Sequence, residues 1–377
     1  MNKRKKGKIP ILSFYSGGGF LDMGFEMANF KIVWSNEYDS AFADLHSAGI
    51  TSWRNSRGFR RKAEIFNKKS IKEISSAEII LEAFPKGKPE FFGVIGGPPC
   101  QDFSVRGNLQ GFDGERGKLT VLYLNKIMEL QPTFFVMENV TGLIKVESHK
   151  ELLTELLEEV KTEYHIDHTV LNAIEFGVPQ SRERVFFIGI RKKYLSEKIL
   201  SKPSDGWFTW PIPIKKYKNA EHKYEWPLAV TYGSTNLVPP SKIPPELFVE
   251  CCLVPVGKES KIHNAMEFFN FQVNGNVLRG IKEGETNRPS FKRLHRFKFS
   301  PTACYGNNEV HLHPYQPRRL SVRETLRIQG VPDTYILPPG GSLSKKFKLI
   351  GNGVPVPLAK AVANALKKFM AVNKIIS

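Results

Sequence analysis

Residues 9–25, IPILSFYSGGGFLDMGF, contain the element that decides the fold. A short apolar run ends at Tyr15, three glycines follow at 17–19, and a helical pattern begins near Leu21. A strand, a glycine-rich turn and a helix in this order are typical of doubly wound α/β folds, where the turn lets a nucleotide-like ligand approach the backbone. A purely structural tight turn would explain the same residues, so the turn alone does not establish a ligand site.

An acidic residue lies where such a ligand would place its ribose. A second strand is expected to end at NEYD, residues 36–39, and an acid about 20 residues after the turn accepts hydrogen bonds from both ribose hydroxyls. Glu37 therefore favours an adenosine-containing cofactor, although a surface carboxylate is the simpler alternative. The spacing does not match G-x-G-x-x-G, and the chain has no G-x-x-x-x-G-K-[ST] loop, which disfavours NAD and ATP.

Alternating patterns extend outward from this element. From residue 9 to about 190, β-rich runs alternate with amphipathic stretches of helix length, as in a parallel sheet covered by helices on both faces. Strands are expected at 9–15, 31–35, 91–95, 133–138 and 185–190, and helices at 118–130, 149–162, 322–330 and 357–370. A proline-rich stretch without clear periodicity lies between the elements expected up to residue 190 and the two helices expected after residue 317. We therefore expect a first domain at 1–191, a loop-rich second domain at 192–316 and a segment at 317–377 that returns to the first domain.

Charge and composition limit the kind of partner. The 377 residues include 55 Lys and Arg against 37 Asp and Glu, a net charge of +18. This charge favours a polyanion, most simply nucleic acid, over a small acidic molecule, although a solvated basic surface is the alternative. A hydrophobic fraction of 41% excludes a wholly disordered chain.

Cysteine spacing bears on disulfides and metal sites, and hydropathy bears on the cellular compartment. The four cysteines form no C-x-x-C pair, so neither a disulfide framework nor a zinc site is indicated, and no metal is predicted. No apolar run is long enough for a membrane span or a secretory signal. We expect a cytoplasmic protein without membrane association.

The stretch GGPPCQDFS, residues 96–104, directly follows one of the apolar runs. Its glycines and prolines define a stiff turn that holds Cys100 at the carboxyl edge of the sheet, a position suited to a nucleophile. A structural cysteine would more usually lie inside an apolar run. The glycine-rich stretch 101–118 is typical of a mobile lid.

Two further motifs bring charge to the same edge. MENV, residues 137–140, ends an apolar run at Glu138, whose carboxyl group, if partly desolvated, would have a raised pKa and donate a proton or a hydrogen bond. QSRER, residues 180–184, places Arg182 and Arg184 on one face before the next strand. Arginines there suit a phosphate or a pyrimidine carbonyl, with surface salt bridges as the alternative.

Taken in order, these motifs resemble those of the cytosine-C5 DNA methyltransferase family, particularly the compact bacterial enzymes of type II restriction-modification systems. The set is completed by RRLSVRETLRIQGVPD at 318–333 and IGNGVP at 350–355, and it covers residues 9–191 and about 290–372. The resemblance implies a doubly wound, Rossmann-like methyltransferase domain and a smaller, loop-rich target-recognition domain at 192–316.

The resemblance also implies the site and its cofactor, S-adenosyl-L-methionine. Cys100 is implied as the nucleophile that adds to C6 of a flipped-out cytosine, Glu138 as the group at N3 and the amino group, and Arg184, supported by Arg182, as the partner of the carbonyl. Asn352 is implied to brace the catalytic loop. The expected cofactor residues are Tyr15, Gly17, Gly19, Glu37, Tyr38, Ser70, Pro98, Leu119 and Asn352, and the expected DNA and base contacts are Pro99, Gln101, Ser104, Asn139 and Thr302.

The family usually has Phe where Tyr15 stands and often glycine where Phe20 stands, so the adenine pocket is expected to differ in shape. Ser70 lies near the position of the family's usual acidic adenine contact.

The implied partners are double-stranded DNA and, functionally, a restriction endonuclease, with the chain acting as a monomer. Two alternatives remain open: an RNA cytosine-C5 methyltransferase resembling the transfer-RNA enzyme of the same fold, and a non-catalytic DNA-binding homologue. The full-length recognition segment favours duplex DNA, and the retained Cys100, Glu138, Arg184 and Asn352 argue against an inactive protein. The basic and aromatic stretch at 291–300 does not reveal the target sequence.

Overall fold

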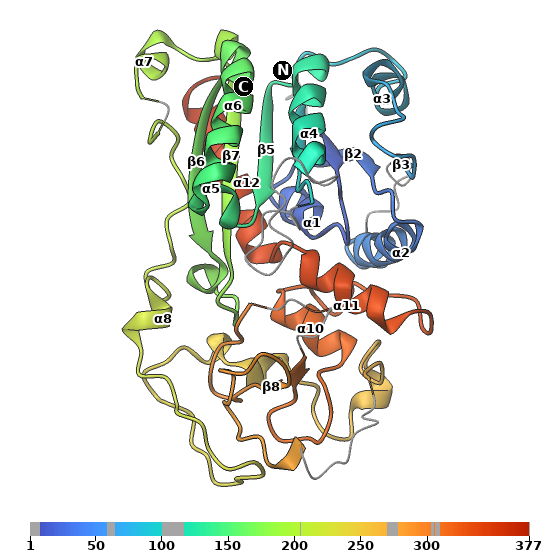
Figure 1. The fold of residues 1–377 in the computed structure, drawn as a ribbon. Helices are drawn as coiled ribbons and strands as arrows, with labels where there is room; N and C mark the ends of the chain where they lie inside the picture. Colours follow the sequence, from blue (N-terminus) through green and yellow to red (C-terminus); the bar gives the residue numbers. More distant parts are fainter. Residues whose placement is uncertain are drawn as a thin grey trace, which may run out of the picture.

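One seven-stranded sheet organises the molecule. The computed structural model describes residues 8–58, 65–99, 117–203, 205–269, 278–302, 305 and 310–376. The strands lie in the order β3-β2-β1-β4-β5-β7-β6 (Figure 1). Their bounds are Pro10–Phe14 (β1), Lys31–Asn36 (β2), Ile65–Asn67 (β3), Gly93–Gly96 (β4), Phe134–Asn139 (β5), Tyr164–Asn172 (β6) and Glu183–Arg191 (β7).

The α-helices alternate with these strands and then continue beyond them. Those that precede the last strand are Phe20–Met27 (α1), Ser40–Ser56 (α2), Ser76–Ala83 (α3), Gly117–Leu130 (α4), Gly142–Lys145 (α5) and Glu147–Glu163 (α6). Those that follow it are Glu197–Leu200 (α7), Ala220–Lys223 (α8), Val322–Ile328 (α10), Leu343–Asn352 (α11) and Val356–Val372 (α12). In the part of the chain that the structure describes, no helix is long and apolar enough to span a membrane.

The strand directions only partly match the expected parallel sheet. Parallel pairing joins β1 to β2 and to β4, β2 to β3, and β4 to β5, so the carboxyl ends of these strands meet at one edge. The prediction is wrong for β7, which runs antiparallel to both β5 and β6. The connection from β6 to β7 explains this difference: residues 173–182 contain a single 3-10 turn, Ala173–Phe176 (η1), and are too short for a parallel crossover.

The β5–β7 ladder has a fixed register. Glu138 pairs with Phe186, and Asn139 pairs with Val185. Gly189 pairs with Phe135, and a Cβ on Gly189 would lie 2.1 Å from the Phe135 ring. The ring therefore occupies the space above Gly189, and a larger residue there would displace it.

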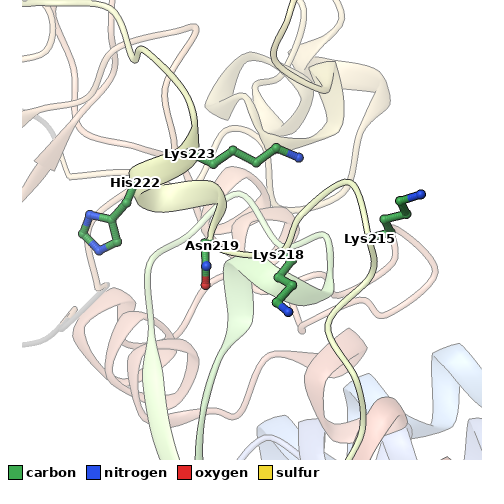
Figure 2. Close-up of a pocket in the computed structure, with 5 residues that line it drawn as sticks. All are labelled: Lys215, Lys218, Asn219, His222 and Lys223. Carbon is green, nitrogen blue, oxygen red and sulfur yellow. The ribbon is translucent and has the colours of Figure 1, made fainter.

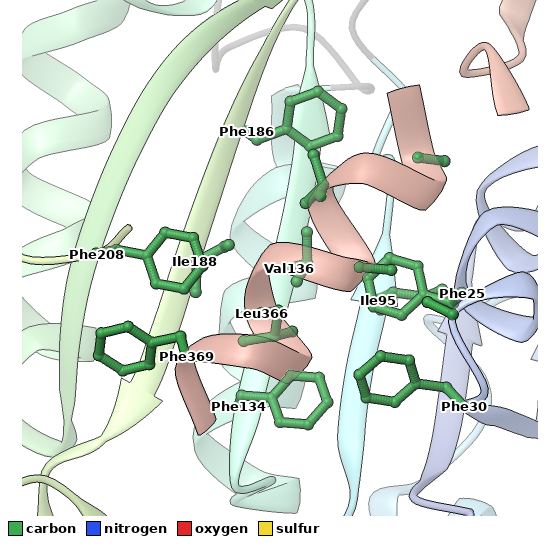
Figure 3. Close-up of a cluster of buried hydrophobic side chains, with 14 of the residues drawn as sticks. Phe25, Phe30, Ile95, Phe134, Val136, Phe186, Ile188, Phe208, Leu366 and Phe369 are labelled. Atoms are coloured by element: carbon green, nitrogen blue, oxygen red, sulfur yellow. The ribbon is translucent and has the colours of Figure 1, made fainter. Parts of the chain in front are cut away.

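Hydrophobic clusters cover both faces of the sheet, as expected. On one face α1 and α12 pack against β5 and β7 through residues such as Phe25, Phe134 and Phe369 (Figure 3). On the other face α3, α4 and α6 pack against the same sheet through residues such as Tyr123 and Leu153. The helix α12, formed near the end of the chain, thus fills the core beside α1.

The described residues between 205 and 320 contain few regular elements and lie beyond the carboxyl edge of the sheet (Figure 1). This region contains small apolar clusters together with buried charged side chains, some of which pair with α10. The buried Arg293 guanidinium donates to the carbonyl oxygens of Leu278 and His313, at 2.7 Å each. The buried Glu324 carboxylate accepts from Arg318 at 2.7 Å. The domain boundaries at 191 and 316 stay predictions.

Candidate active site

The glycine-rich turn is tied to the end of β2. Tyr15, Gly17 and Gly19 have positive φ angles of 52°, 51° and 73°. The Gly17 amide donates to Glu37 Oε2 at 3.0 Å, and the Asp39 amide donates to Oε1 of the same carboxylate at 3.0 Å. Burial raises the pKa of Glu37, and these two amides oppose the shift. The structure thus brings Gly17 and Glu37 together at the edge where the sequence expects a ribose.

Neighbouring side chains crowd one end of this turn, at Gly19, and leave space at the other, at Gly17. A Cβ on Gly19 would lie 2.8 Å from the His46 ring and from Ile50, whereas a Cβ on Gly17 would meet no atom within 4 Å among the described residues. The backbone at Gly17 therefore faces open space, as a cradle for a ligand requires.

Polar side chains under the turn hold it in place, and sequence reasoning missed them. Tyr335 donates its hydroxyl proton to the Gly18 carbonyl at 2.9 Å, and His46 Nδ1 lies 3.1 Å from the Gly17 carbonyl oxygen. Ser13 donates to Asp22 Oδ1 at 2.6 Å. Asp22 and His46 are buried within helices, and a polar residue on an otherwise apolar helix face was the available signal.

The other expected cofactor residues are placed as follows. Tyr15 donates its hydroxyl proton to the Leu119 carbonyl at 3.1 Å, which joins the turn to the start of α4. Ser70 follows a segment held to β2, since Asn36 Nδ2 donates to the Lys69 carbonyl at 2.9 Å. Tyr38 is 71% exposed.

A buried ion pair lies at the carboxyl end of β5. Glu138 is 7% exposed, and Arg184 Nε lies 2.9 Å from its Oε1. A Cβ on Gly97 would lie 2.9 Å from Glu138 Oε2, so the glycine makes room for the carboxylate. Burial raises the pKa of Glu138 and outweighs the opposing effects of Arg184 and Arg182. The carboxyl group therefore holds its proton to a higher pH than an ordinary glutamate.

Other predicted residues make hydrogen bonds near this ion pair. Arg182 is fully buried and donates to the Gly351 carbonyl at 2.7 Å. Asn139 Nδ2 donates to the Pro98 carbonyl at 3.4 Å, and Thr302 donates its hydroxyl proton to the Ser181 carbonyl at 2.8 Å. The predicted residues from β4, β5, β7 and the 300s thus meet at one place.

Comparisons with known proteins identify the family. Residues 9–368 match the sequence profile of the C-5 cytosine-specific DNA methylases. The chain belongs to this family. It is therefore an enzyme, a DNA cytosine-C5 methyltransferase, as its motifs predict.

Relatives of this methylase cover nearly all of its length. The Type II methyltransferase M.NmeDI of Neisseria meningitidis serogroup C is 38% identical, and the match spans 98% of this chain and 86% of that protein. The Type II methyltransferase M.FnuDI of Fusobacterium nucleatum is 31% identical over 96% of this chain and 94% of that protein.

Solved structures share the fold of the methylase. One, described as a prophage-encoded DNA modification methyltransferase of E. coli, has a TM-score of 0.66 at 24% identity and covers 97% of this chain and 100% of its own. The S. pombe Dnmt2 methyltransferase has a TM-score of 0.59 at 15% identity, over 97% of this chain and 100% of its own. These two likenesses concern the fold.

A polar network next to Arg182 of the methylase was not predicted. Glu221 of α8 accepts from the Ser181 hydroxyl at 2.6 Å and from Asn172 Nδ2 at 3.2 Å. Asn172 Oδ1 in turn accepts from the Arg182 amide at 2.9 Å. An asparagine at the end of a strand is a common turn signal, but nothing in the sequence marks Glu221.

Some predicted residues of the methylase are not brought into the site or cannot be placed. The Asn352 side chain, at the end of α11, is exposed, and the preceding Gly351 makes the contact to Arg182. Cys100, Gln101 and Ser104 lie outside the described residues, and Pro99 is the last described residue before them. Within the described ranges, no group of three His, Cys, Asp or Glu side chains forms a metal site.

Proposed function

We propose that this methylase transfers the methyl group of S-adenosyl-L-methionine to C5 of a flipped-out cytosine in a specific duplex DNA sequence. The observation that carries the proposal is the buried Glu138–Arg184 pair. It lies beside Gly97, three residues before Cys100 in the chain. An acid with a raised pKa next to a guanidinium matches the edge of a cytosine, which offers N3 and a carbonyl oxygen.

The cofactor residues fit this donor. Glu37 would bind the ribose hydroxyls, because each carboxylate oxygen accepts one backbone amide and keeps a lone pair for a further donor. Gly17 would leave room for the ligand over the turn, and Tyr15 with Leu119 would border the adenine. When bound, S-adenosyl-L-methionine supplies an electrophilic methyl group.

Cys100 would activate the ring. Cytosine C5 is a poor nucleophile, but a thiolate that forms a bond to C6 makes C5 electron-rich. Glu138 would give its proton to N3, so that the electron pair displaced by the addition does not leave a bare charge on the ring. After methyl transfer, Glu138 would take back the N3 proton, and solvent would accept the C5 proton. The electron pair of the C5–H bond then restores the C5–C6 double bond and expels the Cys100 thiolate.

Arg184 and Arg182 would hold the base in place. The duplex buries C6, so the cytosine must rotate out of the stack at a cost of a few kcal/mol. Arg184, which touches Glu138, would donate to the cytosine carbonyl. Arg182 is fixed by the Gly351 carbonyl and would support the same pocket.

The remaining roles extend the proposal. Residues 192–316 would recognise the target sequence, Pro99, Gln101, Ser104, Asn139 and Thr302 would border the DNA or the base, and Asn352 would brace the catalytic loop. A restriction endonuclease that cuts the same sequence would be the functional partner of a monomeric methylase. A bisulfite map of DNA from cells that express the protein would report both the activity and the target.

The test of the mechanism uses target DNA with fluorine at C5 of the cytosine. Cys100 can still add and the ring can still be methylated, but fluorine does not leave as a cation, so the thiolate stays attached. We expect a denaturant-resistant protein–DNA adduct that requires S-adenosyl-L-methionine, maps to the peptide with Cys100 and is absent from Cys100→Ser. An adduct on Cys251, Cys252 or Cys304, or none from active enzyme, would contradict the proposal. Labelled methyl groups found in RNA alone would favour an RNA methyltransferase. The absence of labelled methyl groups from both DNA and RNA would favour a non-catalytic homologue.

A further inference from the structure

A hollow lined by cations lies at α8 and the residues just before it, inside the proposed recognition segment and apart from the residues named for the cofactor and the base. Lys215, Lys218, Asn219, His222 and Lys223 line a space of about 440 Å³, which we call the lysine hollow (Figure 2). All five side chains are exposed. The lining contains no acidic residue.

Three acids near the lysine hollow, Glu246, Glu175 and Glu221, accept hydrogen bonds from groups other than its ammonium groups, and the exposed Glu225 forms no ion pair among the described residues. Glu246 is bound by Lys216 and by the Tyr217 hydroxyl, and the hydrogen bond from Lys216 is the main reason its pKa falls to about 2. Glu175 accepts the Asn219 amide at 2.8 Å, and Glu221 accepts from the Ser181 hydroxyl at 2.6 Å. Among the described residues, Lys215, Lys218 and Lys223 form no ion pair, whereas the neighbouring Lys216 does.

The lysine hollow rests on a rigid support. Tyr217 and Ala220 are buried in a cluster with Ile174 and Leu247. A Cβ on Gly177, in the turn between β6 and β7, would lie 2.9 Å from the Tyr217 ring. The lysine backbones are therefore held in place before any ligand arrives, which lowers the entropic cost of binding.

The same helix is fastened to the candidate base pocket. Glu221 lies one residue before His222 of the lysine hollow, and its carboxylate binds Ser181. Ser181 directly precedes Arg182. A duplex whose cytosine enters the pocket at Arg182 and Arg184 would therefore bring its backbone close to α8.

We propose that the lysine hollow binds phosphodiester groups of the DNA backbone that flanks the target sequence. The inference rests on the proposed function, because it places the duplex by the base pocket. Three ammonium groups that form no ion pair within the described residues suit phosphates, which lysine binds as a point charge without reading the base sequence. Each neutralised phosphate adds affinity and salt dependence through the release of counterions.

The test compares two triple variants. One is Lys215→Ala/Lys218→Ala/Lys223→Ala; the control, Lys86→Ala/Lys198→Ala/Lys368→Ala, removes the same charge from exposed lysines in the loop after α3, in α7 and in α12. We expect the first variant to reduce the slope of log affinity against log salt by about 0.9 per lost contact, up to about 2.7 in total. The loss should be equal for target and non-target duplexes, and the single-turnover rate at saturating DNA should not change.

A chemical probe locates the contact. Neutral methylphosphonates that replace the flanking phosphates one at a time should weaken binding by the unmodified protein and by the control, but not by the first variant. An unchanged salt slope in the first variant, or a lower single-turnover rate with an unchanged slope, would overturn the inference. If the wild-type protein bound DNA without transferring a methyl group, the proposed function would be contradicted. The salt dependence of DNA affinity would still test the role of the lysine hollow.

Discussion

At the scale of single residues, the pKa of Glu138 is set by two opposing influences. Burial raises it, while Arg184 and Arg182 lower it. The proposed step needs the protonated carboxyl group, so its rate should fall as the pH rises through this pKa. Arg184 therefore has two effects that can be separated: it would hold the base in position, and it lowers the pKa of Glu138.

Replacing Arg184 with an uncharged residue separates these effects. In Arg184→Met the stabilisation of the carboxylate is lost, so the pKa of Glu138 should rise further. We expect a lower maximal single-turnover rate and a decline in rate that begins at a higher pH than in the wild type. The measurement is the single-turnover rate against pH at saturating DNA and cofactor.

Two matched variants control this experiment. Glu138→Gln cannot transfer a proton, so the decline assigned to Glu138 should disappear together with most of the rate. Lys145→Met removes a cation that pairs with the exposed Glu183 and should leave the profile unchanged. A decline in Arg184→Met that stays in place or moves to lower pH would argue against Glu138 as the proton donor.

At the scale of elements, α8 supports the turn before β7. Glu221→Ala removes the acceptor of the Ser181 hydroxyl and one of the two acceptors of Asn172 Nδ2, which keeps only the Ser181 oxygen at 3.3 Å. We expect a loss of about 1–2 kcal/mol in the free energy of unfolding. The single-turnover rate should also fall without a change in the KM for the cofactor, because Asn172 also fixes the Arg182 amide.

Denaturant unfolding and single-turnover kinetics check this prediction. Glu225→Ala, a change of an exposed acid two residues after α8, is the control and should have the stability and rate of the wild type. If Glu221→Ala matched that control in both measurements, the network would have no role in holding the turn.

The elements that carry the site differ in how readily the sequence predicts them. The strands β1, β4 and β5 were predictable because each is an apolar run that ends in a motif. The strand β6 was missed because His165 and Asp167 interrupt its apolar pattern. The buried Asp167 carboxylate accepts the amides of Gly206 and Phe208, which lie 39 and 41 residues away in the chain, so no local sequence pattern contains these partners.

The same limit applies to the site itself. Gly17, Glu37, Glu138 and Arg184 could be found because each belongs to a short motif at a strand end. Glu221 could not be found, since its role depends on a contact with Ser181 made only by the folded chain. Cys100 was predicted from sequence and stays a prediction.

At the scale of the whole molecule, the C-terminal segment and the loop-rich region share contacts. The Val254 amide donates to Glu324 at 3.1 Å, and Arg327 donates to the Leu253 carbonyl at 2.9 Å. Leu320 and Ile328 pack in one cluster with Val249 and Leu253. An exchange of the proposed recognition domain that ends at residue 316 would therefore separate α10 from its partners.

Two chimeras with the 38% identical Neisseria relative test this view. One exchanges 192–316, and the other exchanges 192–328 so that α10 keeps its partners. We expect both to methylate the relative's target sequence, and the second to have the higher midpoint of thermal unfolding. Bisulfite mapping and thermal unfolding give the two results. A chimera that kept the original target would place sequence recognition elsewhere.

The antiparallel pairing of β7 with β5 has a consequence for the polarity of the pocket. Paired residues share a face of the sheet, so Glu138, Phe186 and Arg184 lie on one side, and Glu183 lies on the other. A slip of one residue would turn Glu183 toward Glu138 and replace an attraction by a repulsion. The same slip would push Ile188 or Ile190 into the Phe135 ring, where only Gly189 leaves room. Gly189 in the core thus fixes the β5–β7 register. This register decides whether the base would meet the positive charge of Arg184 or the negative charge of Glu183.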